Sequence, residues 1–265
     1  MSGHSKWATI KHKKGAADAK RGKLFAKLIR QVEVAARNGG GDPDMNPTLR
    51  TMFQKARDAS VPLDTIERAI KRGTGELEGV TYEEVTYEGY GPAGVAFYVD
   101  CLTDNINRTA ADVRSTFTHS GGNLGTAGSV AFQFTRKGSI AVDKVIVSDE
   151  KKVPDRENAV DEDEFMMAVA EAEGDDYEDA GDEWIVYTAY DKMQDVVKGL
   201  EAQGIEVKGS ELTMVPNTST ELELSDAKKV QRLIDKLEEL DDVQNVYTSM
   251  SVSDEVAEAL DADEE

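Results

Sequence analysis

The hydrophobic period of the chain changes near residue 80, and this change separates a helical part from a mixed part. Before it, apolar residues recur at three- and four-residue steps, as they do along one face of an α-helix. After it, short runs rich in β-forming residues alternate with helical patterns. The sequence therefore predicts an α+β protein in which an N-terminal helical domain precedes two α/β domains.

Three amphipathic helices with short connections are predicted before residue 80, and together they form a small bundle. They cover residues 18–38, 47–59 and 64–73. Glycines follow the first helix and end the third, as expected of residues that adopt a left-handed backbone at low cost. The predicted N-terminal caps are Asn46 for the second helix and a capping box of Asp64 and Glu67 for the third.

A hairpin, a helix and a further strand are predicted between residues 80 and 136. Residues 81–88 and 94–102 flank a turn and form the hairpin. Residues 107–119 are helical, with Asn105 or Asn107 as the cap. Residues 129–135 alternate in polarity as a strand does, with Val130, Phe132 and Phe134 pointing inward.

The order of elements from residue 138 to 213 is typical of a ferredoxin-like domain. Strands and helices follow one another as β-α-β-β-α-β, the split βαβ arrangement. The predicted elements are a strand at 140–147, a helix at 161–172, two short strands within 175–190, a helix at 191–203 and a strand at 206–213.

The elements after residue 213 are too few for a domain of their own. A helix at 225–240 and a strand at 243–250 are predicted to return to the sheet of residues 80–136. The last thirteen residues hold seven acids and no base, a composition that predicts disorder. The predicted domains are the basic arm and helical bundle (1–79), a discontinuous α/β domain (80–136 plus 214–252), an inserted ferredoxin-like α/β domain (137–213) and an acidic disordered tail (253–265).

Charge is divided unevenly along the chain, although its net value is −21. Residues 1–79 hold 16 Lys and Arg against 9 Asp and Glu, a net of +7, whereas residues 80–265 hold 15 against 43, a net of −28. A basic segment on an acidic body is typical of proteins that bind a polyanion with one end. The uneven charge therefore indicates a nucleic-acid partner for the first domain.

Cations and two aromatic rings near the N-terminus are the candidate contacts with nucleic acid. Lys and Arg neutralise phosphates, and Trp7 and His12 could stack on unpaired bases, although a lone ring such as that of Trp7 more often packs an arm against its domain. The candidates are Lys6, Trp7, Lys11, His12, Lys13, Lys14, Lys20, Arg21, Lys23, Lys27 and Arg30. A secondary set is Arg50, Arg57, Arg68, Lys71, Arg72, Asn107 and Arg108, of which the last two could instead belong to a helix cap.

Other motifs give no indication of catalysis, a metal or a cofactor. The glycine-rich stretch 121–128 follows a helix and precedes a strand, whereas a phosphate-binding loop runs from strand to helix. One cysteine and three histidines have no metal-ligand spacing. We therefore expect a non-enzymatic protein without cofactor. The single cysteine and the lack of a long apolar run predict a cytoplasmic protein away from membranes, and we expect it to be a monomer.

Five blocks of sequence closely resemble the YebC/PmpR family. They are MSGHSKWATIKHKKGAADAKRGKLFAKLIR at the start, TIERAIKRGTG, YEGYGPAGVAF, TDNINRTAADVR and GGNLGTAGSVAFQF, in the family's order. The resemblance implies three domains, the middle one discontinuous. It also implies a transcriptional regulator that binds DNA, while a related mitochondrial protein is a translational activator of cytochrome c oxidase.

The ligand therefore has two candidates. The family label favours DNA and transcription. A lysine-rich, glycine-punctuated arm favours folded RNA, as in a ribosome- or rRNA-binding translation factor that assists elongation or activates translation. The chain departs from the resemblance in residues 149–183, which hold 16 acids and 3 bases, so that nucleic acid is not expected to contact the third domain.

Overall fold

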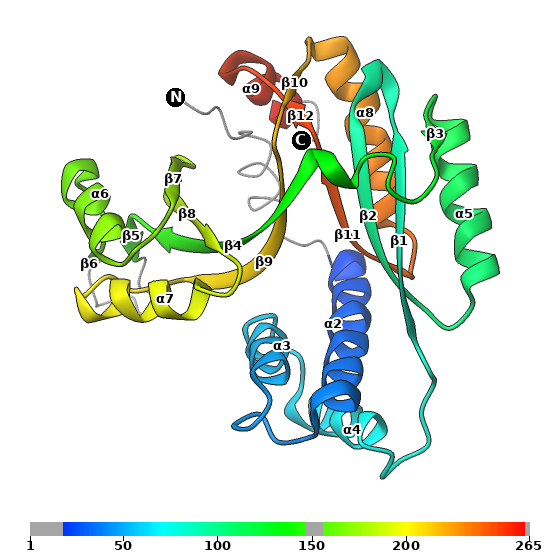
Figure 1. Ribbon diagram of the computed structural model, residues 1–265, viewed down its shortest axis with the longest axis horizontal. Coiled ribbons are helices and arrows are strands. Elements are labelled where there is room, and N and C mark those ends of the chain that lie inside the picture. Colours follow the sequence, from blue (N-terminus) through cyan, green and yellow to red (C-terminus); the bar gives the residue numbers. More distant parts are fainter. Residues whose placement is uncertain (1–17, 147–155, 263–265) are drawn as a thin grey trace. The chain divides into compact units, whose positions relative to one another are not determined.

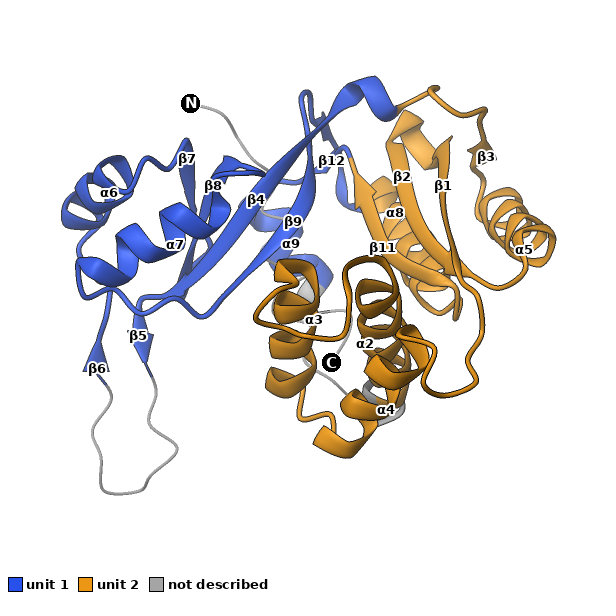
Figure 2. Ribbon diagram, turned by 60° about the horizontal axis from the view of Figure 1, so that its bottom comes forward, with its two compact units in different colours: residues 1–13, 131–224, 249–265 blue, residues 14–130, 225–248 orange. Residues whose placement is uncertain are grey.

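A computed structural model describes residues 18–146 and 156–262 of the chain, with side chains described for 22–146 and 156–260 (Figure 1). The fold mixes helices with small, mostly antiparallel sheets, as predicted. Figure 2 shows two compact units. Of the described residues, unit 2 contains those up to Val130 together with 225–248, and unit 1 contains 131–224 together with those from Ser249 onward.

Unit 2 begins with the three predicted helices, which the structure confirms. They are α2 (Asp18–Gly39), α3 (Pro47–Asp58) and α4 (Leu63–Gly73). Both α3 and α4 pack against α2 and contact one another little (Figure 1). Their shared core consists of Leu28, Val32, Ala35, Ala36, Leu49, Ala56, Val61, Ile66 and Ala69.

Asn46 is the N-cap of α3, as predicted, and its side chain also binds the end of α2. Its Oδ1 accepts a hydrogen bond from the Leu49 amide at 3.1 Å. Its Nδ2 donates to the carbonyls of Ala35 and Gly40, both at 2.8 Å. One buried amide therefore satisfies backbone groups at the end of one helix and the start of the next.

The predicted capping box of α4 is wrong. The cap position is Pro62, which makes no side-chain cap hydrogen bond, and Asp64 already lies in the first helical turn. The cap position lies two residues earlier than the pattern indicates, so the Asp64 carboxylate is displaced from the position that could accept from the third amide.

A four-stranded antiparallel sheet forms the rest of unit 2, in the order β11-β2-β1-β3. Its strands are β1 (Glu83–Tyr90), β2 (Ala96–Thr103), β3 (Asn123–Leu124) and β11 (Val243–Thr248), accompanied by helices α5 (Ile106–His119) and α8 (Leu224–Glu238). Because β11 pairs with β2, the structure confirms that the C-terminal elements return to this sheet.

The predicted strand at 129–135 is wrong. Residues 131–133 form a 3₁₀ turn, η2 (Ala131–Gln133), and the strand starts only at Phe134. Val130 and Phe134 are buried as expected, but the Phe132 side chain is 73% exposed. The alternation of apolar residues is therefore interrupted by a turn at the point where the chain passes from unit 2 to unit 1.

Unit 1 contains the predicted ferredoxin-like arrangement. Its strands are β4 (Phe134–Asp143), β7 (Asp176–Asp179), β8 (Glu183–Ala189) and β9 (Gly209–Pro216), and its helices are α6 (Glu162–Glu171) and α7 (Met193–Ala202). The strands lie in the order β7-β8-β4-β9 and all pair antiparallel. With β4 as first strand, this is the 4-1-3-2 order of a split βαβ domain.

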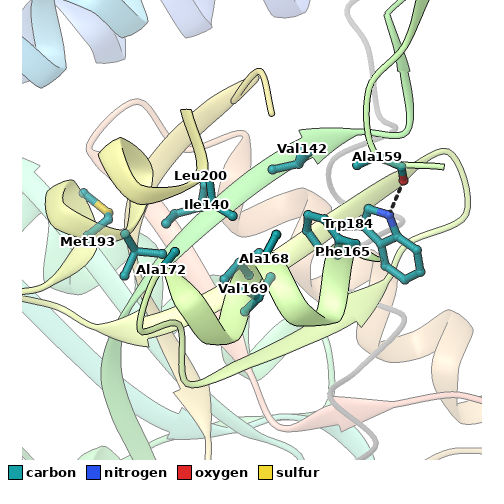
Figure 3. Packing of buried hydrophobic residues seen from close by; sticks show 12 residues of the cluster. Ile140, Val142, Ala159, Phe165, Ala168, Val169, Ala172, Trp184, Met193 and Leu200 are labelled. Carbon is teal, nitrogen blue, oxygen red and sulfur yellow. Dashed lines mark hydrogen bonds between the residues drawn. The ribbon is translucent and has the colours of Figure 1, made fainter. Parts of the chain in front are cut away.

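Trp184 is the largest side chain of the unit 1 core and lies beside Phe165 and Ala159 (Figure 3). The Phe165 ring of α6 stacks on it with centroids 5.2 Å apart, and its indole N–H donates to the Ala159 carbonyl at 2.7 Å. The Lys144 ammonium lies 3.9 Å from the ring centroid. A large apolar ring, its polar N–H satisfied, thus joins α6 to the sheet.

Short elements complete unit 1. They are β5 (Val145–Ile146), β6 (Arg156–Glu157), β10 (Thr220–Glu221), β12 (Met250–Ser251) and helix α9 (Asp254–Ala262). The predicted disorder from residue 253 is wrong for the described part, because residues 254–262 are helical. Ala257 and Leu260 are buried, so the spacing of apolar residues outweighs the acidic composition.

The structure groups the chain into two units, whereas the sequence predicts three domains. The predicted limits of 1–79, of 80–136 with 214–252 and of 137–213 therefore stay a proposal. In the described part of the chain, none of the helices is long and apolar enough to span a membrane.

Replacing Asn46 by Ala tests the link between α2 and α3. The substitution removes one cap acceptor and leaves the carbonyls of Ala35 and Gly40 without their donor, so local stability should fall by about 2 kcal/mol. Hydrogen exchange of amides in α2 and α3 measures the change. The exposed Asn38→Ala substitution is the control, and equal exchange in the two variants would contradict the role of Asn46.

Candidate nucleic-acid interface

Most residues predicted to contact nucleic acid through the arm fall outside the described residues. These are Lys6, Trp7, Lys11, His12, Lys13 and Lys14. Lys20 and Arg21 lie within α2, but their side chains also fall outside the described part. Their contact with nucleic acid stays a prediction. The structure describes the side chains of the other candidate residues.

Three described cations of α2 donate to backbone carbonyls at the C-terminal end of α8 or in the turn that follows it. Lys23 Nζ donates to the Glu239 carbonyl at 3.1 Å, and Lys27 Nζ donates to the Glu238 carbonyl at 2.9 Å. Arg30 donates to the Asp241 carbonyl. Carbonyls at a helix C-terminus are unpaired within the helix and carry partial negative charge, so Lys23 and Lys27 satisfy them and complement the helix dipole, while Arg30 binds the turn that follows the helix.

These three contacts give the basic face of α2 a structural role that the sequence did not reveal. The partners lie more than 200 residues away along the chain, so the spacing of residues in the sequence could not predict these contacts. The contacts hold the helical bundle against the sheet of unit 2. Contact of Lys23, Lys27 and Arg30 with nucleic acid stays a prediction.

The Asp242 carboxylate accepts four hydrogen bonds close to the turn that Arg30 binds. It accepts from Arg108 Nη2 at 2.7 Å, from Thr109 Oγ1 at 2.8 Å and from Arg30 Nη1 and Thr103 Oγ1, both at 3.3 Å. Only 7% of the residue is exposed. These five residues, here called the Asp242 cluster, connect α2, the end of β2, the start of α5 and the turn before β11.

The surroundings keep Asp242 ionised. Burial alone would raise its pKa, but hydrogen bonds from Arg108 and Thr109, together with the charges of Arg108 and Arg30, outweigh burial and lower the pKa below its usual value. The carboxylate therefore stabilises the folded unit at neutral pH. That contribution is lost only as the pH falls through the lowered pKa.

The first turn of α5 contains the candidates Asn107 and Arg108. Asn105 is the N-cap, since its Oδ1 accepts from the Arg108 amide at 3.1 Å. The guanidinium of Arg108 binds Asp104 at 2.8 Å as well as Asp242. Asn107 is exposed. The structure thus brings Arg108 into the Asp242 cluster and leaves Asn107 at the surface beside it.

Two cations of the secondary set serve the fold of the bundle. Arg72 Nε donates to the buried Glu33 carboxylate at 2.8 Å, where Arg37 also binds at 3.3 Å. Arg50 donates to the carbonyls of Pro43 and Asp44, which closes the loop before α3. Arg72 and Arg50, which the sequence predicts as phosphate contacts, therefore bind groups of the protein itself.

Arg57, Arg68 and Lys71 differ from the other described candidates because they are exposed and make no side-chain hydrogen bond or ion pair within the described residues. Arg57 lies in the last turn of α3, while Arg68 and Lys71 lie on α4. We call them the exposed cation set. Their charges are available to a ligand without breaking a contact of the fold.

The glycine-rich stretch 121–128 is a connection, as predicted, since it follows α5 and leads toward β4 with the short strand β3 inside it. The Glu88 carboxylate accepts from the amides of Gly128 at 2.6 Å and Val130 at 2.7 Å. An internal anion therefore already binds amides that would have to face a phosphate. This arrangement explains why a glycine-rich loop here does not indicate nucleotide binding.

The single cysteine, Cys101, is buried and poorly suited to act as a nucleophile. Burial, together with the nearby charges of Asp100 and Asp242, raises the pKa of the Cys101 thiol to about 12, so the thiol stays protonated. No three His, Cys, Asp or Glu side chains within the described ranges are grouped closely enough to hold a metal ion.

The chain matches two family models that together cover most of its length. Residues 5–76 match the TACO1/YebC protein N-terminal domain, and residues 82–250 match the TACO1/YebC second and third domain. It is 53% identical to a probable transcriptional regulatory protein of Acidithiobacillus ferrooxidans, with 99% of both chains covered. A protein of the same description from Cutibacterium acnes is 50% identical over the full length of both.

A solved structure resembles this fold closely. The crystal structure of a conserved hypothetical protein from Aquifex aeolicus has a TM-score of 0.81 and 43% sequence identity. The match covers 94% of this chain and 98% of that one. The arrangement of helices and sheets is therefore shared with a protein of related sequence.

Replacing Asp242 by Asn tests the Asp242 cluster. At pH 7 the variant should lose about 1–3 kcal/mol of stability, because Arg108 and Arg30 lose a charged acceptor. The folded pKa is lowered, so the difference from the wild type should shrink as the pH falls below about 4. Urea unfolding followed by circular dichroism at about pH 7 and about pH 3.5 measures it.

The neighbouring Asp241→Asn substitution is the matched control, since it removes the same charge from an exposed side chain. A stability difference for Asp242→Asn that does not depend on pH would show that its charge is not what stabilises the cluster.

Proposed function

Because the chain belongs to the TACO1/YebC family, we propose that it is a non-enzymatic regulator of gene expression that binds nucleic acid through its helical domain and basic arm. The names of its relatives support the regulatory role. The net charge of +7 in residues 1–79, beside −28 in the remainder, supports a polyanionic ligand for this end of the chain. We propose the cytoplasm as the place of action.

The exposed cation set is the observation that carries this proposal. Several other described cations of the bundle bind carbonyls or carboxylates of the protein, whereas Arg57, Arg68 and Lys71 are exposed and bind none of the described groups. Cations that are not needed by the fold can neutralise phosphates without loss of stability. We propose that these three residues and the lysines of the arm each contribute phosphate contacts to the same ligand.

Helices α3 and α4, both within the described residues, show no surface suited to reading base sequence. In a helix-turn-helix protein, the start of the second helix contacts base edges in the major groove. Here the start of α4 carries Asp64 and Glu67, whose charges would oppose entry between phosphates. In addition, α3 and α4 pack on α2 more than on one another. We therefore infer binding through phosphates and shape.

Folded RNA is the ligand that we propose, and ribosomal RNA in particular. RNA is recognised largely through its shape and backbone, which suits a cationic surface without a base-reading helix. The chain would then act on translation. DNA is the second candidate, favoured by the description of the relatives as probable transcriptional regulatory proteins.

Replacing Arg57, Arg68 and Lys71 together by Ala should weaken binding to ribosomal RNA and make it less dependent on salt. Each lost phosphate contact lowers the slope of log K against log salt by about 0.7 on single strands and about 0.9 on a duplex. Fluorescence anisotropy with a labelled rRNA fragment measures both effects.

The matched control removes three exposed cations of unit 1, Arg136, Lys192 and Lys198, by the same substitution to Ala. Equal loss of affinity in both triple variants would mean that overall charge, and not the bundle surface, determines binding.

Gradient fractionation of native lysate distinguishes RNA from DNA as the ligand. We expect the wild-type protein to sediment with ribosomes at low salt and to dissociate at moderate salt. The Lys11→Ala, Lys13→Ala, Lys14→Ala variant should sediment with them less at every salt concentration. Absence from ribosomal fractions, with sequence-selective retardation of promoter DNA, would instead support transcription.

A further inference from the structure

Helix α6 of unit 1 presents methionines to solvent. Met166 is 46% exposed and Met167 is 68% exposed. Asp163 and Ala170, three or four residues away on the same side of the helix, are exposed as well. Val160, just before the helix, is 51% exposed. Large apolar side chains gathered in this way on a charged surface indicate a contact surface.

The opposite side of α6 is fixed in the core, so the helix cannot turn to bury its methionines. Phe165, Ala168 and Val169 are buried, and the Phe165 ring stacks on Trp184 (Figure 3). Asp161 caps the helix by accepting from the Glu164 amide at 2.9 Å. The exposed methionines are therefore a constant feature of the folded unit.

The sequence around this face is strongly acidic. Residues 157–191 hold 14 Asp and Glu and not one Lys, Arg or His. Some of these acids pair with cations from elsewhere in unit 1, namely Glu173 with Lys192, Asp179 with Lys144, Glu183 with Lys208 and Asp175 with Lys137. The four acids of α6 itself, Glu162, Asp163, Glu164 and Glu171, make no ion pair within the described residues.

We propose that the outer face of α6 binds a basic, amphipathic segment of a partner protein. Methionine is flexible and polarizable, and it adapts to apolar side chains of varied shape. The acids around it attract Lys and Arg on the flanks of the same segment and set its orientation. An amphipathic helix laid with its apolar side on Met166 and Met167 would meet both requirements.

The same charges oppose other occupants. The acids of residues 157–191 that make no ion pair within the described part of the chain, among them the four of α6, repel the phosphates of RNA and DNA and the headgroups of an anionic membrane. The surface is thus distinct in its chemistry from the basic bundle. One chain would bind a polyanion with its helical domain and a basic protein with α6.

Binding of a synthetic peptide tests the proposal. The probe is a fluorescein-labelled peptide of leucine and lysine whose leucines form one helical stripe, and the control peptide has the same composition in scrambled order. We expect the wild-type protein to bind the amphipathic peptide at least about tenfold more tightly, a difference of about 1.4 kcal/mol. Equal binding of both peptides would leave only unspecific charge attraction and would overturn the proposal.

Two double variants locate the binding. Met166→Ser with Met167→Ser should weaken peptide binding about tenfold. Met45→Ser with Leu212→Ser, which changes exposed apolar side chains elsewhere, should leave it unchanged. If the first variant binds like the wild type, α6 is not the surface and the proposal is wrong.

Two further measurements separate peptide binding at α6 from nucleic-acid binding and from self-association. The α6 variant should keep its affinity for ribosomal RNA, so that peptide binding and the proposed function can fail independently. Sedimentation equilibrium should show the same mass for wild type and variant at all concentrations. If the wild type forms a dimer and the methionine variant is a monomer, the outer face of α6 binds a second copy of this chain, and the proposal is wrong.

Discussion

The buried carboxylate of Asp242 is the constraint on which the arrangement of unit 2 depends. A charge with 7% exposure is costly unless it is paired, and its partners come from α2, from the end of β2 and from the start of α5. Arg30 contributes both to this carboxylate and to the carbonyl of Asp241. The bundle and the sheet are therefore joined by directional, charged contacts, since an apolar interface alone would not specify their register.

This junction also decides which cations of the bundle can serve another purpose. A cation that neutralises a buried carboxylate or a helix C-terminus cannot leave for a phosphate without exposing the partner to an unfavourable environment. Lys27 at the end of α8, Arg30 at Asp242 and Arg72 at Glu33 are in that position. The exposed cation set is not. A basic stripe in a sequence therefore shows where positive charge lies along the chain. Only the side-chain contacts in the structure distinguish cations that stabilise the fold from cations that a ligand can bind.

Elements whose signals are local could be predicted from the sequence, whereas features that depend on distant residues could not. The Asn46 cap, the three helices and the ferredoxin-like order follow from spacing and turn residues, and the structure confirms them. Alternation through residues 130–134 predicts an inward Phe132, yet a 3₁₀ turn interrupts the strand there. The acidic composition of the C-terminal residues predicts disorder, but residues 254–262 form a helix, which only the spacing of their apolar residues indicates. The role of Lys27 could not be predicted, since its partner is 211 residues away.

Strong acidity and the proposed binding of nucleic acid are compatible in this chain because they belong to different segments. A polyanion approaching the acidic stretch at 157–191 meets a repulsive field, whereas near the bundle it meets the exposed cation set. The acidity thus restricts which face a nucleic acid can contact, and it does so without any base-specific contact. The exposed methionines of α6 indicate that the acidic stretch does more than keep the protein soluble. A surface that served only solubility would gain nothing from two large apolar side chains among its acids.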